Sequence, residues 1–289
     1  MQVFFFGMGY SSRATARAMR DIIDPDLPIY GTTRQQEQAK VLALENVQAH
    51  QFDGVKPGTT FDDALSQTTH LVHSIAPDEN GDAVLRHHQA DLENTSSIEW
   101  MCYYSTVGVY GNTDGAWIDE NAACDPLNQR SQWRVEAEEA WRMFARQNGV
   151  PLLILRLAGI YGQGRSSFDK LEAGTARRIV KKGQVFNRIH VTDIGRVTAL
   201  AAKAKLEGTF NLADDEPAPP QDLVSFAADM AGVRSPSEVA FEDADMTPMA
   251  RSFYSDNKRV SNAAIKKALG IELLYPTYRK GLTAIYGAS

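Results

Sequence analysis

Short apolar stretches recur along the chain, and they alternate with longer stretches whose apolar positions have helical spacing. The strand-like stretches are VFFF at 3–6, PIYGTT at 28–33, VQAHQF at 47–52, HLVHSI at 70–75, MCYYS at 101–105, LLILRL at 152–157 and GTFNLA at 208–213. Helical patterns occupy 11–21, 34–44, 82–100 and 131–147. Apolar strands that alternate with helices predict a parallel sheet covered on both faces. We therefore expect a doubly wound α/β fold of about seven strands, because crossovers in such sheets are right-handed.

The alternation weakens after residue 162, where residues 163–186 are rich in glycine, arginine and lysine. Residues 214–289 hold a proline cluster and then helical segments. We predict a nucleotide-binding core from 1–162 and 187–213, and a smaller substrate-binding lobe from 163–186 and 214–289.

Charge and cysteine content narrow the class of protein. The net charge is −6, which argues against non-specific binding of nucleic acid. Two cysteines, Cys102 and Cys124, are too few for a disulfide framework and favour a reducing compartment. The N-terminal apolar run lacks the basic flank and the length of a signal peptide, and no later run is long enough for a membrane span. We expect a cytoplasmic protein that binds neither membranes nor nucleic acid.

The first predicted strand leads into the glycine pair of FFFGMGYSSR. Gly7 permits a tight turn, and Gly9 lets backbone approach a pyrophosphate. The helix that follows Tyr10 starts with Ser11 and Ser12 and would direct its N–H groups at the phosphates. Ser12 replaces the third glycine of the G-x-G-x-x-G pattern but is small enough for close packing of helix on strand. The motif predicts a dinucleotide site, and the alternative is a plain strand-to-helix turn.

The end of the second strand indicates which dinucleotide is preferred. Sites for NAD have an acidic residue there, whereas this chain has Thr33 and Arg34. A guanidinium binds a 2′-phosphate, so NADP(H) is expected over NAD(H). The alternative is a solvated arginine that opens the helix of 34–44. Residues at other strand ends complete the predicted site: Asp53 beside the adenine, and Ser74, Ile75 and Ala76 near the middle of the cofactor.

Five further stretches carry a family resemblance. They are STVGVYG at 105–111, LRLAGIYGQGR at 155–165, RIHVTDIGRVTALAA at 188–202, GTFNLADDEP at 208–217 and KRVSNAAIKKALG at 258–270. Together they resemble the extended short-chain dehydrogenases/reductases, a group that includes nucleotide-sugar epimerases and dehydratases. The resemblance covers nearly the whole chain. It implies a seven-stranded Rossmann core with a small C-terminal substrate lobe, and places Ala158 and Gly159 among the cofactor-binding residues.

The family's chemistry uses a Ser/Thr, a Tyr and a Lys four residues after the Tyr. Thr106 matches the Ser/Thr position. In RSQWRVEAE at 130–138, Arg134 falls at the Lys position and Arg130 at the Tyr position. No tyrosine occurs between Tyr110 and Tyr161. The chain therefore resembles an atypical member of the family, with its cofactor motifs retained and its acid/base lost.

Arginine remains protonated at working pH and cannot act as a general acid/base. Arg134 can still donate to ribose hydroxyls, and Arg130 can bind a carboxylate or phosphate or stabilise an oxyanion. The alternative for Arg130 is a solvated position in the first helical turn. Tyr161 and Tyr110 end strands where a substitute acid could sit, although structural packing is the favoured interpretation of both.

Three other features of the sequence concern the substrate, the oligomeric state and metal binding. The basic stretch 163–188 favours an anionic substrate or, more simply, a solvated face. Aromatic residues on the helix of 131–147 support either a homodimer interface or core packing. No histidine or cysteine spacing predicts a metal site.

The leading hypothesis is an oxidoreductase or epimerase that binds NADP(H) and acts on a small, anionic molecule. The rival is a catalytically inactive NADP(H) sensor or scaffold, which the lost tyrosine favours.

Overall fold

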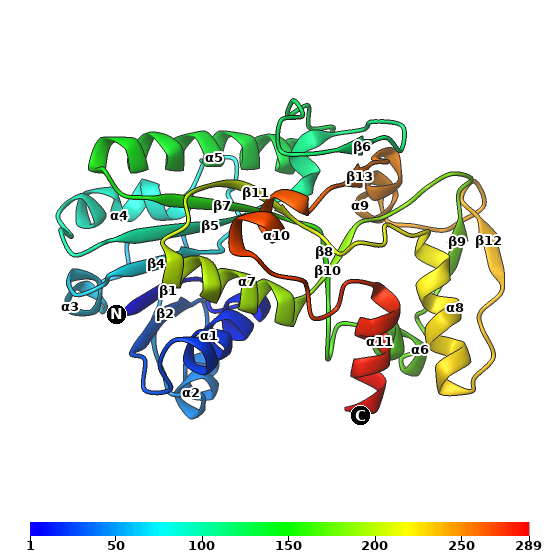
Figure 1. The fold of residues 1–289 in the computed structure, drawn as a ribbon, viewed down its shortest axis with the longest axis horizontal. Coiled ribbons are helices and arrows are strands. Elements are labelled where there is room, and N and C mark those ends of the chain that lie inside the picture. Colours follow the sequence, from blue (N-terminus) through cyan, green and yellow to red (C-terminus); the bar gives the residue numbers. More distant parts are fainter. Residues whose placement is uncertain (289) are drawn as a thin grey trace. The chain divides into compact units, whose positions relative to one another are not determined.

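The computed structural model describes residues 1–288 and has a seven-stranded sheet at its centre (Figure 1). Its strands, in spatial order, are β11 (Gly208–Leu212), β7 (Leu152–Leu157), β5 (Trp100–Thr106), β4 (His70–His73), β1 (Val3–Phe6), β2 (Ile29–Thr33) and β3 (Val47–Gln51). The chain runs outward from β1 to β3 and then returns to β4 on the other side of β1. The sheet is therefore doubly wound, as predicted, with a topological switch point between β1 and β4.

Helices cover both faces of this sheet (Figure 1). One face is covered by α3 (Asp62–Ser66), α4 (Ala83–Glu93) and α5 (Gln129–Asn148). The other is covered by α1 (Tyr10–Ile22), α2 (Gln36–Leu44) and α7 (Val191–Ala204). Helix α7 lies so close to α1 that a Cβ added at Gly195 would stand 2.6 Å from the carbonyl oxygen of Ala14. Both faces of the central strands β1, β4 and β7 are buried, which explains why they are mostly apolar.

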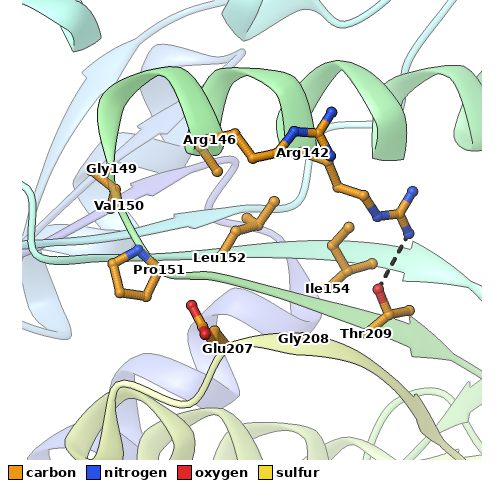
Figure 2. Close-up of a pocket in the computed structure, with 11 residues that line it drawn as sticks. Arg142, Arg146, Gly149, Val150, Pro151, Leu152, Ile154, Glu207, Gly208 and Thr209 are labelled. Carbon is orange, nitrogen blue, oxygen red and sulfur yellow. Dashed lines mark hydrogen bonds between the residues drawn. The ribbon is translucent and has the colours of Figure 1, made fainter.

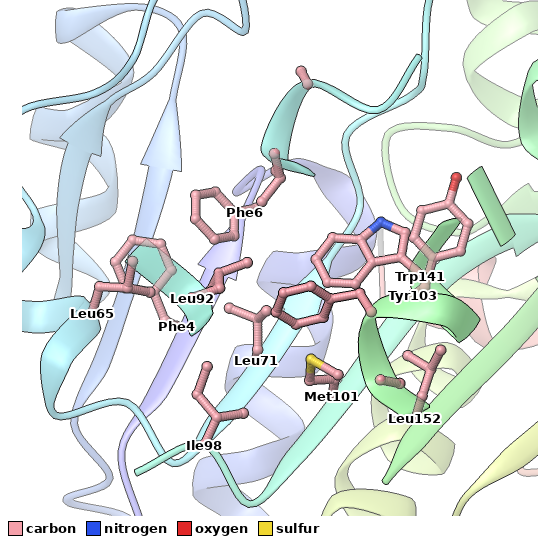
Figure 3. Packing of buried hydrophobic residues seen from close by; sticks show 14 of the residues in the cluster. Phe4, Phe6, Leu65, Leu71, Leu92, Ile98, Met101, Tyr103, Trp141 and Leu152 are labelled. Atoms are coloured by element: carbon pink, nitrogen blue, oxygen red, sulfur yellow. The ribbon is translucent and has the colours of Figure 1, made fainter. Parts of the chain in front are cut away.

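The core on the α4 and α5 side is rich in aromatic rings (Figure 3). Phe4 and Phe6 of β1 pack with Phe61, and Trp141 of α5 lies over Tyr103 of β5. Trp141 and Phe144 are both fully buried here. Core packing thus accounts for two of the aromatic residues on α5.

The chain divides into two compact units. Unit 1 comprises Met1–Thr106, Gln129–Arg156 and Ile194–Phe210, and unit 2 comprises Val107–Asn128, Leu157–Asp193 and Asn211–Ser289. The helices of unit 2 are η1 (Val107–Tyr110), α6 (Ser167–Glu172), α8 (Pro220–Ala231), α9 (Pro248–Ser252), η2 (Phe253–Ser255), α10 (Ala263–Leu269) and α11 (Tyr278–Gly287). The predicted division into a cofactor core and a substrate lobe is one of function, and it stays a prediction.

Three pairs of short parallel strands form outside the main sheet: β8 (Gly159–Tyr161) with β10 (Arg188–His190), β9 (Arg178–Val180) with β12 (Glu238–Ala240), and β6 (Trp117–Ile118) with β13 (Arg259–Val260). The strands β9, β12 and β13 are not among the predicted strand-like stretches, all of which end by residue 213. Strands of two or three residues are too short for apolar periodicity to reveal them. The helix predicted over 82–100 ends at Glu93. The hydroxyl of Thr95, just beyond the helix, donates to the carbonyl of Asp91 in its last turn.

Candidate functional site

The glycine turn after β1 has the geometry that a dinucleotide site requires. Gly7 has φ of +93°, a region that favours glycine, and a Cβ there would stand 2.8 Å from the hydroxyl oxygen of Ser74. The Gly7 N–H donates to the side-chain oxygen of Thr32 at 2.9 Å. The turn after β1 is thus fixed by both neighbouring strands, β2 and β4.

Gly9 is the N-cap of α1 and faces open space. No heavy atom lies within 4 Å of a Cβ built at this position. No side chain caps the helix, and its first turn has no acidic residue. The N-terminal end of α1, which includes Tyr10 and Ser11, therefore carries the positive end of the helix dipole without a carboxylate to neutralise it.

Ser12 occupies the third position of the glycine pattern and is 1% exposed. Its hydroxyl donates to that of Ser74 at 3.0 Å, and Ser74 in turn donates to the carbonyl of Gly7 at 2.8 Å. Serine is therefore small enough for α1 to pack closely at this position. Ile75 is half-buried against the core, and Ala76 is exposed.

At the end of β2, Thr33 is half-buried and Arg34 is exposed. The backbone carbonyl of Arg34 accepts from Gln51, but its guanidinium has no partner within residues 1–288. Asp53 is exposed and accepts from the backbone N–H groups of Val55 and Lys56, which lower the pKa of its carboxyl. The Asp53 carboxylate is thus already engaged in its own turn.

The end of β5 is held by a buried ionic network. The Ser105 hydroxyl donates to Glu138 of α5 at 2.5 Å, and Arg156 of β7 donates to the same carboxylate at 2.7 Å. These donors outweigh burial and lower the pKa of Glu138. Thr106 follows directly and is half-buried. The network fixes the backbone at the predicted Ser/Thr position.

The two α5 arginines predicted for the site, Arg130 and Arg134, differ in their surroundings. Nη1 of Arg134 donates to the hydroxyl of Tyr103 at 3.0 Å and to the carbonyl of Tyr104 at 2.7 Å. Arg130, one turn earlier, is exposed and has no hydrogen-bond or ion-pair partner in the described part of the chain. Arg134 is therefore anchored to β5, whereas Arg130 presents a free cationic group.

Unit 2 holds the remaining predicted residues. Ala158 is buried with its N–H bound to the carbonyl of Leu212, and Gly159 is exposed. The Tyr161 phenol is buried in an apolar cluster, where desolvation raises its pKa, and its hydroxyl points to the carbonyl of Thr277 at 3.5 Å. The Tyr110 hydroxyl donates to the side chain of Asn211 at 2.6 Å. The geometry favours structural packing for both tyrosines.

The interpretation of 163–188 as a solvated basic face was wrong for Arg188. This residue is 7% exposed and donates to the carbonyls of Phe186 and Ala218. Its guanidinium satisfies buried carbonyl groups between two segments of unit 2, which the charge pattern alone does not reveal.

Unit 1 therefore brings one set of predicted residues together. The glycine turn, Ser74–Ala76, Thr33–Arg34 and Thr106 all follow the carboxyl ends of neighbouring strands of one parallel sheet. Ligands of open α/β sheets bind at this edge, next to the switch point.

Comparison with solved structures then decides the family. A functionally unknown conserved protein from Silicibacter pomeroyi DSS is 42% identical over the whole of this chain and 99% of its own, with a TM-score of 0.90. A putative NAD-dependent epimerase/dehydratase from Methylobacillus flagellatus is 24% identical over 99% and 97% of the two chains, with a TM-score of 0.71. The UDP-glucuronic acid 4-epimerase of Bacillus cereus, in complex with NAD, is 16% identical over 99% and 96%, with a TM-score of 0.77.

The chain belongs to the family of the Silicibacter protein, and it shares the fold of the Methylobacillus epimerase/dehydratase and of the Bacillus cereus epimerase. No protein-family model and no curated protein matches it.

A groove of about 510 Å³ lies in unit 1 between the end of α5 and the strands β7 and β11 (Figure 2). None of the predicted site residues lines it. Its Arg142 donates to Glu138 at 2.8 Å and to Thr209 at 3.2 Å, so the guanidinium is used within the protein. We assign no function to this groove.

The described residues contain neither a metal-binding cluster nor a membrane-spanning helix. Within residues 1–288, no three His, Cys, Asp or Glu side chains gather as a metal site. In the same range, no helix is long and apolar enough to cross a bilayer.

The sequence does not reveal the partners of Arg134 or of Ser105, which precedes Thr106. Tyr103 lies in an apolar strand, which predicts a core residue, and its side chain is indeed buried. Its contact with Arg134 depends on how α5 lies over β5, and no spacing along the chain encodes that. The same holds for Glu138 and Arg156, which are far apart in sequence yet share one buried ion pair.

Proposed function

We propose that the protein binds NADP(H) in unit 1, along the carboxyl edge of β1, β2, β4 and β5. The observation that carries the proposal is the glycine turn, where Gly9 leaves open space in front of an uncapped helix terminus. Gly7, Gly9 and Ser11 would hold the pyrophosphate while the buried Ser12 packs α1 against the strand, and Ser74–Ala76 would line the middle of the cofactor. When bound, NADP(H) supplies or accepts a hydride.

The preference for NADP(H) over NAD(H) rests on Arg34. The chain has no carboxylate at the end of β2 to accept a ribose 2′-hydroxyl, and the unpaired guanidinium of Arg34 suits a 2′-phosphate. The structurally similar Bacillus cereus epimerase is in complex with NAD, so the preference is a property of this chain's own residues.

We expect the Arg34→Asp variant to lose about tenfold or more in NADPH affinity, because a hydrogen bond to a charged group contributes about 1.5–3 kcal/mol. Its NADH affinity should fall far less. Fluorescence titration of both cofactors measures this. An equal loss for the two cofactors would show that Arg34 does not contact the 2′-phosphate.

The reaction that we propose is that of an oxidoreductase or epimerase on a small anionic molecule. Thr106 would orient the substrate, and Arg130 would bind its anionic group. Arg134 would hold the cofactor ribose. Any proton must come from water near Thr106 or from the substrate itself, since the phenols of Tyr161 and Tyr110 are buried and hydrogen-bonded.

A second function is favoured by the same burial of tyrosines. Without an accessible acid/base, the protein would bind NADP(H) as a sensor or scaffold and turn nothing over. The free guanidinium of Arg130 favours the enzyme, because an exposed cation at the first turn of α5 works against the helix dipole unless an anion binds there.

Substitution of Arg130 distinguishes the two functions. If the protein is an enzyme, Arg130→Ala should raise KM about tenfold or more, and Arg130→Lys should retain part of the activity, because lysine keeps the charge but not the bidentate geometry. Both variants should fold, since the side chain is exposed. Assays with NADPH against carbonyl compounds and nucleotide sugars measure this. Turnover unaffected by Arg130→Ala would remove Arg130 from the site, and no turnover in the wild type favours the sensor.

The setting of this activity follows from the composition. Cys102 and Cys124 form no disulfide with each other, which suits a reducing cytoplasm. The half-buried Trp133 of α5 remains available to a homodimer interface, and we propose that unit 2 contributes the substrate-binding lobe.

A further inference from the structure

The guanidinium of Arg134 is hydrogen-bonded through only one of its three nitrogens within the described residues. Nη1 makes both of its hydrogen bonds to β5, and Nε and Nη2 have no partner in the range that the structure describes. In an arginine side chain, Nε and Nη2 share one edge and donate in parallel to two oxygens. Anchoring through Nη1 therefore leaves the side-on pair of donors intact and fixed in direction.

Tyr103 is the side chain that fixes this direction. Its ring is fully buried, and the centre of the guanidinium lies 5.6 Å from the ring centroid. The phenol oxygen accepts from Nη1 at 3.0 Å. Burial raises the pKa of Tyr103, so its hydroxyl remains neutral and serves as a dipole and not as an acid.

Tyr103 is itself immobilised. Its ring stacks on His73, with centroids 5.2 Å apart. It also stacks on Trp141, with centroids 6.3 Å apart (Figure 3). His73 and Trp141 both hydrogen-bond to the same carboxylate oxygen of Asp82. The other oxygen of Asp82 caps the N-terminus of α4. The orientation of Arg134 thus derives from a buried aromatic stack and not from solvent-exposed groups.

We propose that Tyr103 is a positioning residue, which turns Arg134 into a fixed two-pronged donor for the adjacent hydroxyls of the cofactor's nicotinamide ribose. This inference rests on the proposed function. A vicinal diol offers two neighbouring oxygens, which match the parallel Nε and Nη2 donors. A lysine would supply a single charged point at the end of a flexible stem. The contact of Tyr103 with Arg134 gives the arginine the rigidity that a ribose site requires.

The test is a double-mutant cycle on NADPH affinity. Tyr103→Phe removes the hydroxyl and keeps the ring, so the aromatic stack and the fold should persist. We expect it to weaken NADPH binding about fivefold in the wild-type background, because an Arg134 side chain released from Tyr103 must be ordered when the cofactor binds. In the Arg134→Lys background it should change the affinity less than about twofold.

Tyr104→Phe is the matched control. Tyr104 is the neighbouring buried phenol, and its hydroxyl binds Thr15 and Thr198 on the opposite face of the sheet. This variant should lower the thermal midpoint at least as much as Tyr103→Phe and leave NADPH affinity unchanged, because Arg134 contacts only the Tyr104 backbone.

Tyr103 would have a merely structural role if Tyr103→Phe lowered NADPH affinity equally in the wild-type and Arg134→Lys backgrounds, or if Tyr104→Phe lowered it as much as Tyr103→Phe. Either result would overturn this inference and leave the proposed function standing. The same conclusion follows if Tyr103→Phe leaves the affinity unchanged. A wild-type protein that does not bind NADPH overturns both the inference and the proposed function.

Discussion

The Gly9→Val variant should fold like the wild type and lose NADPH binding by about a hundredfold or more. Gly9 has φ of −84°, which any residue adopts, and a Cβ there meets no atom within 4 Å. The folded protein therefore has room for the side chain. The branched methyl groups would instead occupy the space in front of α1 that the pyrophosphate needs. Thermal unfolding and fluorescence titration measure the two effects separately.

Gly287→Val provides a control of the same chemistry, because the Cβ of Gly287 in α11 also meets open space. It should leave NADPH affinity unchanged. If Gly9→Val binds NADPH as tightly as the wild type, the pyrophosphate does not lie on this turn.

The second large effect concerns stability in alkaline solution, through Asp214 of unit 2. This side chain is 1% exposed, and one carboxylate oxygen has no hydrogen-bond partner within the described residues. Burial raises its pKa to about 8, against the opposing effects of the Glu216 N–H and of Arg188. The folded state thus binds a proton that the unfolded state has lost above its ordinary pKa. Stability should fall as pH rises from about 4 to 8.

Asp214→Asn removes the ionisable group and keeps the oxygen that accepts from Glu216. We expect the variant to be more stable than the wild type by about 2–4 kcal/mol at pH 8, after the cost of one unpaired amide is deducted. The difference should shrink toward pH 5. Denaturant unfolding at several pH values measures it.

Asp243→Asn is the control, since Asp243 is an exposed carboxylate of the same unit. It should change stability little at any pH. A stability difference for Asp214→Asn that does not vary between pH 5 and 8 would show that Asp214 is already charged in the folded protein.

The main sheet could be predicted from the sequence because its central strands are apolar runs and its other strands are β-type stretches bounded by helical patterns. The run 152–157, for example, coincides with β7. The pairs β9–β12 and β6–β13 could not be predicted, because they form between segments that are distant in sequence and only two or three residues long. Their stability comes from tertiary packing and not from local propensity.

The candidate site divides in the same way. Gly7, Gly9 and Arg34 are local signals, since a turn and a strand end carry their meaning in neighbouring residues. Arg134 could be placed at the Lys position by counting, but its anchor on Tyr103 arises only when α5 packs on β5. The burial of Arg188 likewise depends on carbonyl groups that another segment supplies.

Titration of the wild-type protein with NADPH and with NADH, in the same buffer, tests the central claim most directly. The free guanidinium of Arg34 and the open glycine turn predict saturable binding of both cofactors, with NADPH bound about tenfold or more tightly. Equal affinity for the two, or no binding of either, would contradict the assignment of an NADP(H) site to this edge of the sheet.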